Sequence, residues 1–295
     1  MPFLEPTAKA LRTRSLLEIH LAVLLFGFPG LFGKWIPLSP PLIVLGRVIL
    51  ASLALGVALA VRRAPLRIAP ARDLALLVVC GLILAVHWTM FFRSIQISTV
   101  AIGLLSYSSF PVFTAFLEPL ALGERWDPWS LIFAAVTMGG VFLMVPAYDL
   151  SNPGFQGVLW GLGAGLTFAF LAVLNRDLSR RHSSLHVAFY QDFFAVLFLM
   201  PFAFLIRFQL TWRTAGLLVL LGVFGTAAAH ALFINGMKRA GARTASIISA
   251  LEPVYGVVLA LAFLKESPSL RTISGGALIL AAALTVSVKT SRSSP

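Results

Sequence analysis

Apolar residues along this chain gather into ten long runs that are separated by short polar gaps. A helix that crosses a bilayer needs about 20 predominantly apolar residues, and each run reaches about that length. The gaps leave no room for a water-soluble domain. The pattern therefore predicts an all-α integral membrane protein with ten transmembrane helices, at residues 16–36, 40–61, 73–93, 98–120, 128–147, 156–176, 184–206, 214–236, 243–264 and 270–288.

The composition indicates the same class of protein. Hydrophobic residues make up 59% of the chain, its mean hydropathy is +0.92, and only 12% of its residues are charged. So few polar groups cannot cover a surface that faces water. Soluble enzymes, disordered chains and secreted disulfide-rich scaffolds are excluded, and the single cysteine, Cys80, has no partner for an internal disulfide.

Basic residues set the expected topology. The net charge is +12, but Lys and Arg sit between the apolar runs, where they orient a membrane protein instead of binding nucleic acid. With a cytoplasmic N-terminus, sixteen Lys and Arg fall in cytoplasmic segments and six in external ones. This bias predicts cytoplasmic N- and C-termini and a multi-pass protein of the cell inner membrane.

The two halves of the chain match at an offset of 142 residues. Pro111, Val112, Phe113, Leu117, Leu122 and Glu124 align with Pro253, Val254, Tyr255, Leu259, Leu264 and Glu266. Lys34 and Arg176 align at the same offset, at the ends of the first and sixth runs. Each half holds five spans, and this odd number requires the halves to insert with opposite orientation. Two inverted five-helix repeats are typical of secondary transporters.

The repeat predicts how the chain is divided. The expected parts are a cytoplasmic N-terminal segment (1–15), a first five-helix repeat (16–147), a linker (148–155), a second five-helix repeat (156–288) and a cytoplasmic tail (289–295).

Motifs in both halves resemble one family of transporters. A Pro-Val-aromatic sequence lies in the fourth and ninth spans, and Leu-x-Glu closes each of them. Together with Gly123-Glu124-Arg125, the run Leu251-Glu252-Pro253-Val254 and Arg47 in the second span, these features resemble the EamA-type drug/metabolite transporters over nearly the whole chain. The resemblance implies a ten-helix fold and carrier-mediated transport.

Within that family the sequence is most similar to the YddG-like amino-acid exporters, which implies export of aromatic or other neutral amino acids. The first span has no acidic residue near its middle, since Glu18 lies near its cytoplasmic start. The small four-helix multidrug exporters of the same superfamily use a glutamate at that depth. Its absence argues against proton-driven efflux of cationic drugs.

Polar residues inside the spans are the candidates for a substrate site, because they are costly against lipid and should face the protein interior. In the fourth span, Ser106, Tyr107 and Ser109 precede Pro111, which removes a backbone hydrogen bond. The serine hydroxyls either contact substrate or satisfy the carbonyls that the proline leaves free.

The ninth span carries Glu252 and, one turn later, Tyr255. A carboxyl group at this depth serves either as a proton-coupling group or as an anchor for a substrate ammonium. The alternative is a glutamate that hydrogen-bonds a neighbouring helix and defines its packing.

Two histidines, His87 and His230, occupy nearly matching positions in the third and eighth spans, and Trp88 follows the first of them. They either line the substrate site or donate hydrogen bonds between helices, and no accompanying carboxylate or cysteine suggests a metal. In the sixth span, Trp160 and Asn175 lie on a face suited to an aromatic or aliphatic substrate side chain.

Arg47 in the second span can bind a substrate carboxylate through two parallel hydrogen bonds. It can equally form a structural ion pair with Asp192, which lies in the corresponding region of the seventh span.

Glycine and proline mark the expected hinge or gating positions, which are Gly27, Pro29 and Gly30 in the first span, Pro111 in the fourth and Pro253 in the ninth. The alternative is a static kink. A stripe of Gly157, Gly161 and Gly165 in the sixth span is typical of a surface where another backbone approaches closely.

These features favour a secondary transporter that exports aromatic or neutral amino acids, or similar small metabolites, by alternating access. The alternative is an exporter of drugs or lipophilic cations from the same superfamily. A channel or a membrane enzyme is less favoured, because no filter-like loop or catalytic motif is present. The expected partners are a small-molecule substrate and membrane lipid, without nucleic acid, metal or cofactor, in a monomer or weak homodimer.

Overall fold

The structure, a computed structural model, describes residues 8–293 except 67, 69, 124–128, 230, 231, 234, 237–243 and 245–247. Within these residues all regular secondary structure is helical, which confirms the predicted fold class at that level. The elements are α1 (Ala8–Gly27), α2 (Pro29–Trp35), α3 (Pro40–Val61), α4 (Ala71–Ile97), α5 (Val100–Tyr107), α6 (Phe110–Leu122), α7 (Trp129–Met144), α8 (Pro153–Leu178), α9 (Ser184–Leu205), α10 (Trp212–Gly222), the π-helical segment η1 (Val223–Ala228), α13 (Glu252–Leu264) and α14 (Leu270–Ser293).

Six helical segments of the described chain are long and apolar enough to cross a membrane, judged by length and composition. They are Thr13–Trp35, Pro40–Val61, Ala71–Ile97, Val100–Ala121, Pro153–Leu178 and Ser184–Leu205. Shorter apolar helices lie where the sequence predicts the other spans, at Leu131–Met144, Trp212–Thr226, Glu252–Leu264 and Leu270–Thr285. The count of ten spans stays a prediction, and so does the inverted repeat.

Proline positions explain where the broken helices begin. Pro29 starts α2, and Pro111 and Pro253 occupy the first turns of α6 and α13. A proline has no N–H to donate, and the first turn of a helix needs no donor, so it is tolerated there. The predicted hinge prolines thus each open a new helical segment, and Ser108 and Ser109 separate α5 from α6.

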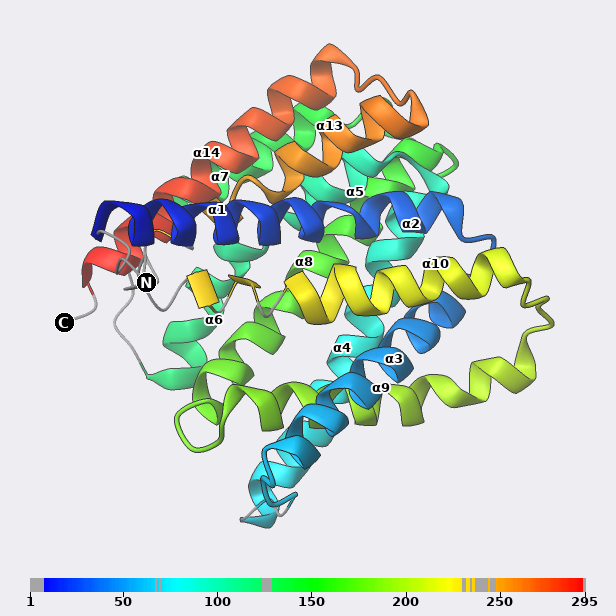
Figure 1. The fold of residues 1–295 in the computed structure, drawn as a ribbon. Helices are drawn as coiled ribbons and strands as arrows, with labels where there is room; N and C mark the ends of the chain where they lie inside the picture. The colour runs from blue at the N-terminus through cyan, green and yellow to red at the C-terminus, as the bar shows by residue number, and fades with distance from the viewer. Residues whose placement is uncertain are drawn as a thin grey trace, which may run out of the picture.

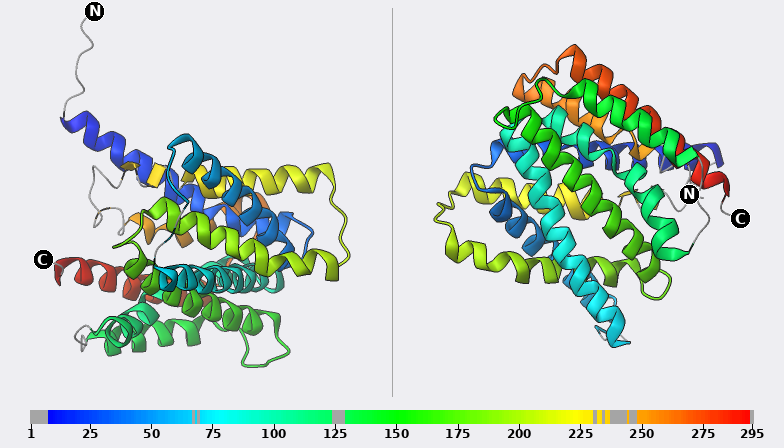
Figure 2. Two further views of the ribbon diagram at one scale, coloured as in Figure 1. Left: turned by 90° about the horizontal axis from the view of Figure 1, so that it is seen from below. Right: turned by 180° about the vertical axis from the view of Figure 1, so that it is seen from behind.

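The most extensive helix contacts join the N-terminal half to the C-terminal half. α4 packs along α8, α7 along α14, α3 along α9, and α1 along α13. Figures 1 and 2 show α7 and α14 on one side of the molecule, α3 and α10 on the opposite side, and α4 and α8 between them. The two halves are therefore interleaved around a shared interior, where the main buried apolar cluster draws on α2, α3, α4, α5, α8, α9, α10 and α13.

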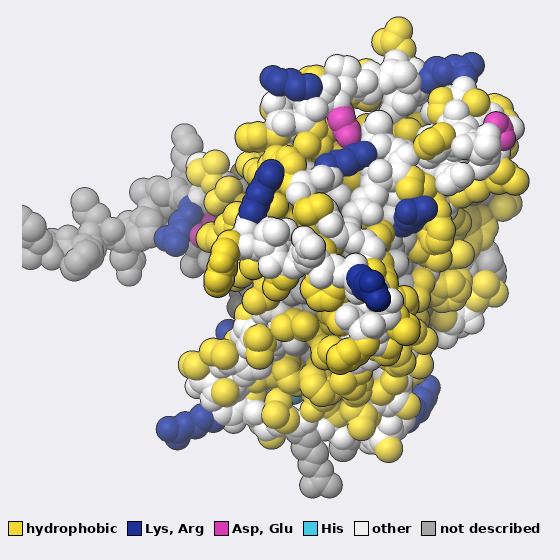
Figure 3. All heavy atoms as spheres, turned by 90° about the vertical axis from the view of Figure 1, so that its right-hand side faces the viewer, with side chains coloured by type: hydrophobic (Ala, Val, Ile, Leu, Met, Phe, Trp, Pro, Cys, Tyr) yellow, Lys and Arg dark blue, Asp and Glu magenta, His cyan; other side chains and the backbone are white. Residues whose placement is uncertain are grey.

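The outer surface is suited to lipid. Leu53, Val57 and Val61 lie four residues apart on α3, and all three are exposed. Figure 3 shows one face on which hydrophobic side chains predominate and Lys and Arg interrupt them. Exposed apolar area of this extent has no explanation in a soluble monomer, so the surface supports the multi-pass membrane assignment.

Candidate functional site

Arg47 is the centre of the most unusual group of side chains in the described structure. Its side chain is buried, with 4% of the residue exposed. The guanidinium carbon lies 3.6 Å from the centre of the Trp88 ring, and Nε donates a hydrogen bond to Thr226 Oγ1 at 3.1 Å. Nη1 is buried without a hydrogen-bond partner. Stacking on an aromatic ring leaves the N–H groups of a guanidinium available in its own plane.

Two carboxylates, Asp192 and Glu252, lie within electrostatic range of Arg47. Both residues are half-buried, and neither carboxylate takes part in a hydrogen bond or ion pair anywhere in the described chain. The ion pair between Arg47 and Asp192 that the sequence left open as a structural alternative is therefore absent from the described contacts. Tyr107 also interacts electrostatically with Arg47 and Glu252, and its hydroxyl has no partner among the described residues.

Aromatic rings pack beside these charged groups. The Tyr107 ring stacks on Phe110 with ring centroids 5.4 Å apart, and Phe168 packs edge-on against both. His87 lies 4.9 Å from Trp88 by the same measure. We refer to these rings as the aromatic cluster, which consists of His87, Trp88, Phe91, Tyr107, Phe110 and Phe168.

The groups converge from helices of both halves. Arg47 is on α3, Trp88 on α4, and Asp192 on α9, whereas Glu252 begins α13. Thr226 lies in η1, whose π-helical geometry is frequent at functional sites. Its hydroxyl accepts from Arg47 and donates to the Leu221 carbonyl at 3.2 Å, which fixes one edge of the guanidinium.

Serines in the fourth predicted span satisfy backbone carbonyls. Ser106 donates to the Ile102 carbonyl at 2.5 Å, and Ser109 donates to the Ser106 carbonyl at 2.7 Å. Both residues are buried against α8, where Gly161 and Gly165 face their hydroxyls. The two serine hydroxyls thus make the hydrogen bonds that the packing alternative describes, while a contact with substrate stays a prediction. Of the three candidate residues in this span, Tyr107 is the one that interacts electrostatically with Arg47.

His87 and Tyr255 are also engaged in contacts between helices. His87 Nδ1 lies 2.9 Å from the Ala164 carbonyl, as expected of an interhelical donor, while its ring belongs to the aromatic cluster. The Tyr255 hydroxyl lies 2.7 Å from His20 Nδ1, on the contact of α13 with α1. The other predicted histidine, His230, lies outside the described residues, as do Glu124 and Arg125 of the repeated motif.

Two residues of α8 lie away from the cluster. Trp160 is exposed, with 39% of its surface accessible. Asn175 accepts a short hydrogen bond from the Gln191 side chain of α9. In the described contacts neither residue touches Arg47 or the aromatic cluster.

The first predicted hinge is a site of close packing. A Cβ on Gly27 would lie 3.0 Å from the Gly256 backbone nitrogen, and one on Gly30 would lie 2.8 Å from Val100. A side chain at Gly27 would press on the α13 backbone, and one at Gly30 would press on the Val100 side chain. The structure therefore supplies a packing reason for these residues, and a moving hinge stays a prediction.

Two ion pairs lie at the ends of the interface between the halves. Lys34 pairs with Glu266 at 3.7 Å, and Arg176 pairs with Glu118 at 2.9 Å. Lys34 and Arg176 are the two basic residues that align in the sequence repeat. The first pair is reinforced because Lys34 also donates to the Ser98 carbonyl and Glu266 accepts from the Val100 N–H.

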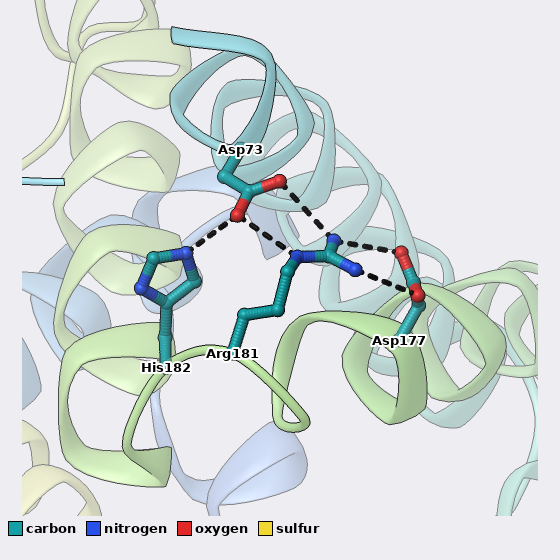
Figure 4. Close-up of polar contacts among 4 residues, drawn as sticks. All are labelled: Asp73, Asp177, Arg181 and His182. Carbon is teal, nitrogen blue, oxygen red and sulfur yellow. Dashed lines mark hydrogen bonds and ion pairs between the residues drawn. The ribbon is translucent and has the colours of Figure 1, made fainter. Parts of the chain in front are cut away.

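A further polar cluster joins the start of α4 to the end of α8. Figure 4 shows Asp73 accepting from Arg181 and contacting His182 Nε2 at 2.7 Å, while Arg181 also donates to Asp177. Hydrogen bonds to Asp177 and Asp73 hold the pKa of Arg181 above its usual value. Arg181 therefore bridges Asp73 at the start of α4 and Asp177 near the end of α8.

Sequence reasoning missed several of these groups. The repeat offset of 142 aligns Phe110 with Glu252, and each residue begins a helix. Phe110 belongs to the aromatic cluster, and Glu252 lies within electrostatic range of Arg47. The contacts of Asp73 with Arg181 and His182 span 108 and 109 residues, and no local pattern indicates them.

Known proteins place the chain among transporters. The model of the EamA-like transporter family matches residues 14–145 and 155–288. An uncharacterized transporter of Archaeoglobus fulgidus is 29% identical over 195 residues, which cover 66% of this chain and 69% of that protein. The uncharacterized transporter YxxF of Bacillus subtilis is 25% identical over 278 residues, 92% of this chain and 88% of its own.

Another relative, an S-adenosylmethionine uptake transporter of Rickettsia prowazekii, is 26% identical over 208 residues, 69% of this chain and 68% of its own. A solved crystal structure has the same fold, with a TM-score of 0.63 over 95% of this chain and 98% of that one, at 20% identity. Relatives that are named transporters argue against an enzymatic role. The chain is a multi-pass membrane transporter and belongs to the EamA-like transporter family.

Proposed function

We propose that the protein exports aromatic or other neutral amino acids, or closely similar metabolites, across the cell inner membrane by alternating access. The observation that carries this proposal is the combination of Arg47, Asp192 and Glu252, all without ion-pair partners among the described residues, with the aromatic cluster at the interface of the two halves. A small amino acid presents the complementary groups, which are a carboxylate, an ammonium and an apolar side chain.

The partial exposure of the surrounding residues supports access by a small molecule. Trp88, Tyr107, Phe168 and Glu252 are half-buried, so the protein's own atoms leave part of their surfaces uncovered. Intramembrane charges are costly unless they are paired or serve a transport pathway. Unpaired carboxylates next to aromatic rings are therefore expected where a substrate completes the contacts.

Relatives add support for the class of substrate. The protein from Rickettsia prowazekii is named for uptake of S-adenosylmethionine, a molecule that carries an amino-acid group and an aromatic base. It moves its substrate inward, so the direction of transport here rests on the resemblance to amino-acid exporters and is part of the proposal.

A second candidate is transport of lipophilic organic cations. Two carboxylates for one arginine, beside rings that can hold a cation over their faces, favour it. Transport of the cation without transport of any amino acid would select this candidate.

The test is counterflow into liposomes that contain the purified full chain. Labelled aromatic, aliphatic and charged amino acids, together with tetraphenylphosphonium, are offered with and without a proton gradient. We expect saturable counterflow of aromatic and neutral amino acids. If no amino acid shows counterflow while tetraphenylphosphonium is clearly taken up, the proposal is overturned.

A further inference from the structure

We infer that Arg47 selects the substrate by its carboxylate. Carboxylate-bearing aromatic compounds then bind the central cluster, which we define as Arg47, Asp192, Glu252 and the aromatic cluster, and binding of their decarboxylated amines does not depend on Arg47. The inference rests on the proposed function for placing the transport site at this cluster, and it assigns the chemical group that the site requires.

The hydrogen bonds of Arg47 leave a suitable pair of donors. Nε is occupied by Thr226, while neither terminal nitrogen donates to a described residue, and Nη1 is buried without a partner. A buried donor without a partner is costly, and such groups are rare in native proteins. A carboxylate bound by the two terminal nitrogens would satisfy both through parallel hydrogen bonds.

The position of the guanidinium is fixed before substrate arrives. Trp88 contacts it at 3.6 Å from the ring centre, and Thr226 holds Nε. Side-chain entropy is therefore already lost, and a ligand gains the hydrogen bonds without having to order the arginine.

Neighbouring acids do not occupy these donors. Asp192 and Glu252 influence Arg47 electrostatically but form no ion pair with it among the described contacts. They remain available to attract the ammonium of the same molecule. The arrangement places opposite charges at separate points beside the aromatic cluster, as a zwitterion with an aromatic side chain requires.

The test compares L-tryptophan with tryptamine, which lacks only the carboxylate. Binding of each labelled compound is measured by equilibrium dialysis on the purified full chain and on the Arg47→Gln and Arg47→Lys variants. Loss of charge-assisted hydrogen bonds is expected to weaken L-tryptophan binding to Arg47→Gln by about 10-fold to 100-fold. Tryptamine binding should be unchanged or stronger, which also shows that the variant is folded.

Lysine keeps the charge but cannot form the two parallel hydrogen bonds. Arg47→Lys should therefore weaken the binding of L-tryptophan less than Arg47→Gln does. Arg93, an exposed arginine of α4, provides the matched control, and Arg93→Gln should bind both compounds as the wild type does. If Arg47→Gln loses affinity for L-tryptophan and for tryptamine equally, or loses affinity for neither, the inference is overturned.

The outcomes separate this inference from the proposed function. L-tryptophan counterflow that survives Arg47→Gln contradicts the inference alone. Arg47-dependent binding of L-tryptophan without counterflow supports the inference and contradicts export. Wild-type protein that binds neither compound, or tryptamine only, contradicts both.

Discussion

Arg47 is a buried charge whose local contacts do not by themselves account for its burial. A cation over a desolvated indole gains about 2 kcal/mol, whereas an unpaired buried charge costs several. Trp88 and Thr226 therefore offset only part of the cost in the described contacts. The nearby carboxylates and a substrate carboxylate are the groups that can supply the rest.

Glu252 is the residue whose substitution tests whether transport is coupled to protons. Its half-buried carboxyl group has no hydrogen-bond partner in the described chain, so we expect a proton or a substrate ammonium to bind it during transport. Glu252→Gln is expected to abolish the pH dependence of L-tryptophan counterflow between mildly acidic and mildly alkaline conditions. Glu18→Gln is the control, since the Glu18 carboxylate on α1 already pairs with Arg14 and accepts a hydrogen bond from Asn235. A Glu252→Gln variant with the wild-type pH profile would discard the coupling role.

The close contact between helices α8 and α5 depends on glycines of α8, which have no side chain. A Cβ on Gly157, Gly161 or Gly165 would contact Ser98, Ser106 and Ser109 respectively. The serine hydroxyls meanwhile bond carbonyls of their own chain segment. The two helices pack as closely as their backbones and hydroxyls allow, and this packing holds Tyr107 against Phe168.

Gly161→Ala is predicted to destabilise the protein by about 1–3 kcal/mol, because an added methyl overpacks a filled contact. Gly139→Ala is the matched control, since nothing lies within 4 Å of a Cβ there. The control should be neutral or stabilising by about 0.5–1 kcal/mol, from the lower helix propensity of glycine. Thermal unfolding in detergent measures both variants, and equal melting temperatures would show that the α5–α8 contact is looser than described.

At the scale of the whole molecule, each of the two ion pairs joins one half to the other. Lys34 and Glu266 lie at the predicted external end, and Arg176 and Glu118 at the predicted cytoplasmic end. If the halves rock about the central cluster, the two pairs cannot both persist through a transport cycle.

Breaking the Lys34 pair should favour the conformation open to the outside, and breaking the Arg176 pair should favour the one open to the cytoplasm. The Phe168→Cys substitution in a Cys80→Ala background places a thiol in the aromatic cluster, and labelling of that thiol by a membrane-impermeant maleimide reports access to the cluster. Lys34→Gln is expected to raise labelling from outside, and Arg176→Gln from the cytoplasmic side. Charge exchange by Lys34→Glu with Glu266→Lys should restore the wild-type pattern. Both single variants shifting labelling in the same direction would contradict rocking between two ends.

Sequence reasoning found what local chemistry determines. Helix-breaking prolines and intramembrane charges can be recognised from the sequence alone. Pro111 and Pro253 are therefore predicted as hinge positions, and Arg47 and Glu252 as candidate site residues. It could not decide whether Arg47 pairs with Asp192, because that choice depends on how α3, α4 and α9 place their side chains.

The sequence also does not predict which side chains of distant helices contact one another. Tyr255 is predicted to contact substrate, and this role stays a prediction. The contact of its hydroxyl with His20, which follows from the packing of α1 on α13, has no signal in the sequence. Ser106 and Ser109 were left open between two roles, and only the packing of α8 shows that their hydroxyls are enclosed. Phe110 was within reach through its alignment with Glu252.

The most direct test of the central claim is a cryo-electron microscopy map of the full chain with L-tryptophan bound. We predict ligand density at the central cluster, with the carboxylate at the terminal nitrogens of Arg47 and the indole against Tyr107, Phe110 and Phe168. Density for L-tryptophan elsewhere on the protein, with Arg47 unchanged and unliganded, would contradict the assignment of Arg47 and the aromatic cluster as the substrate site.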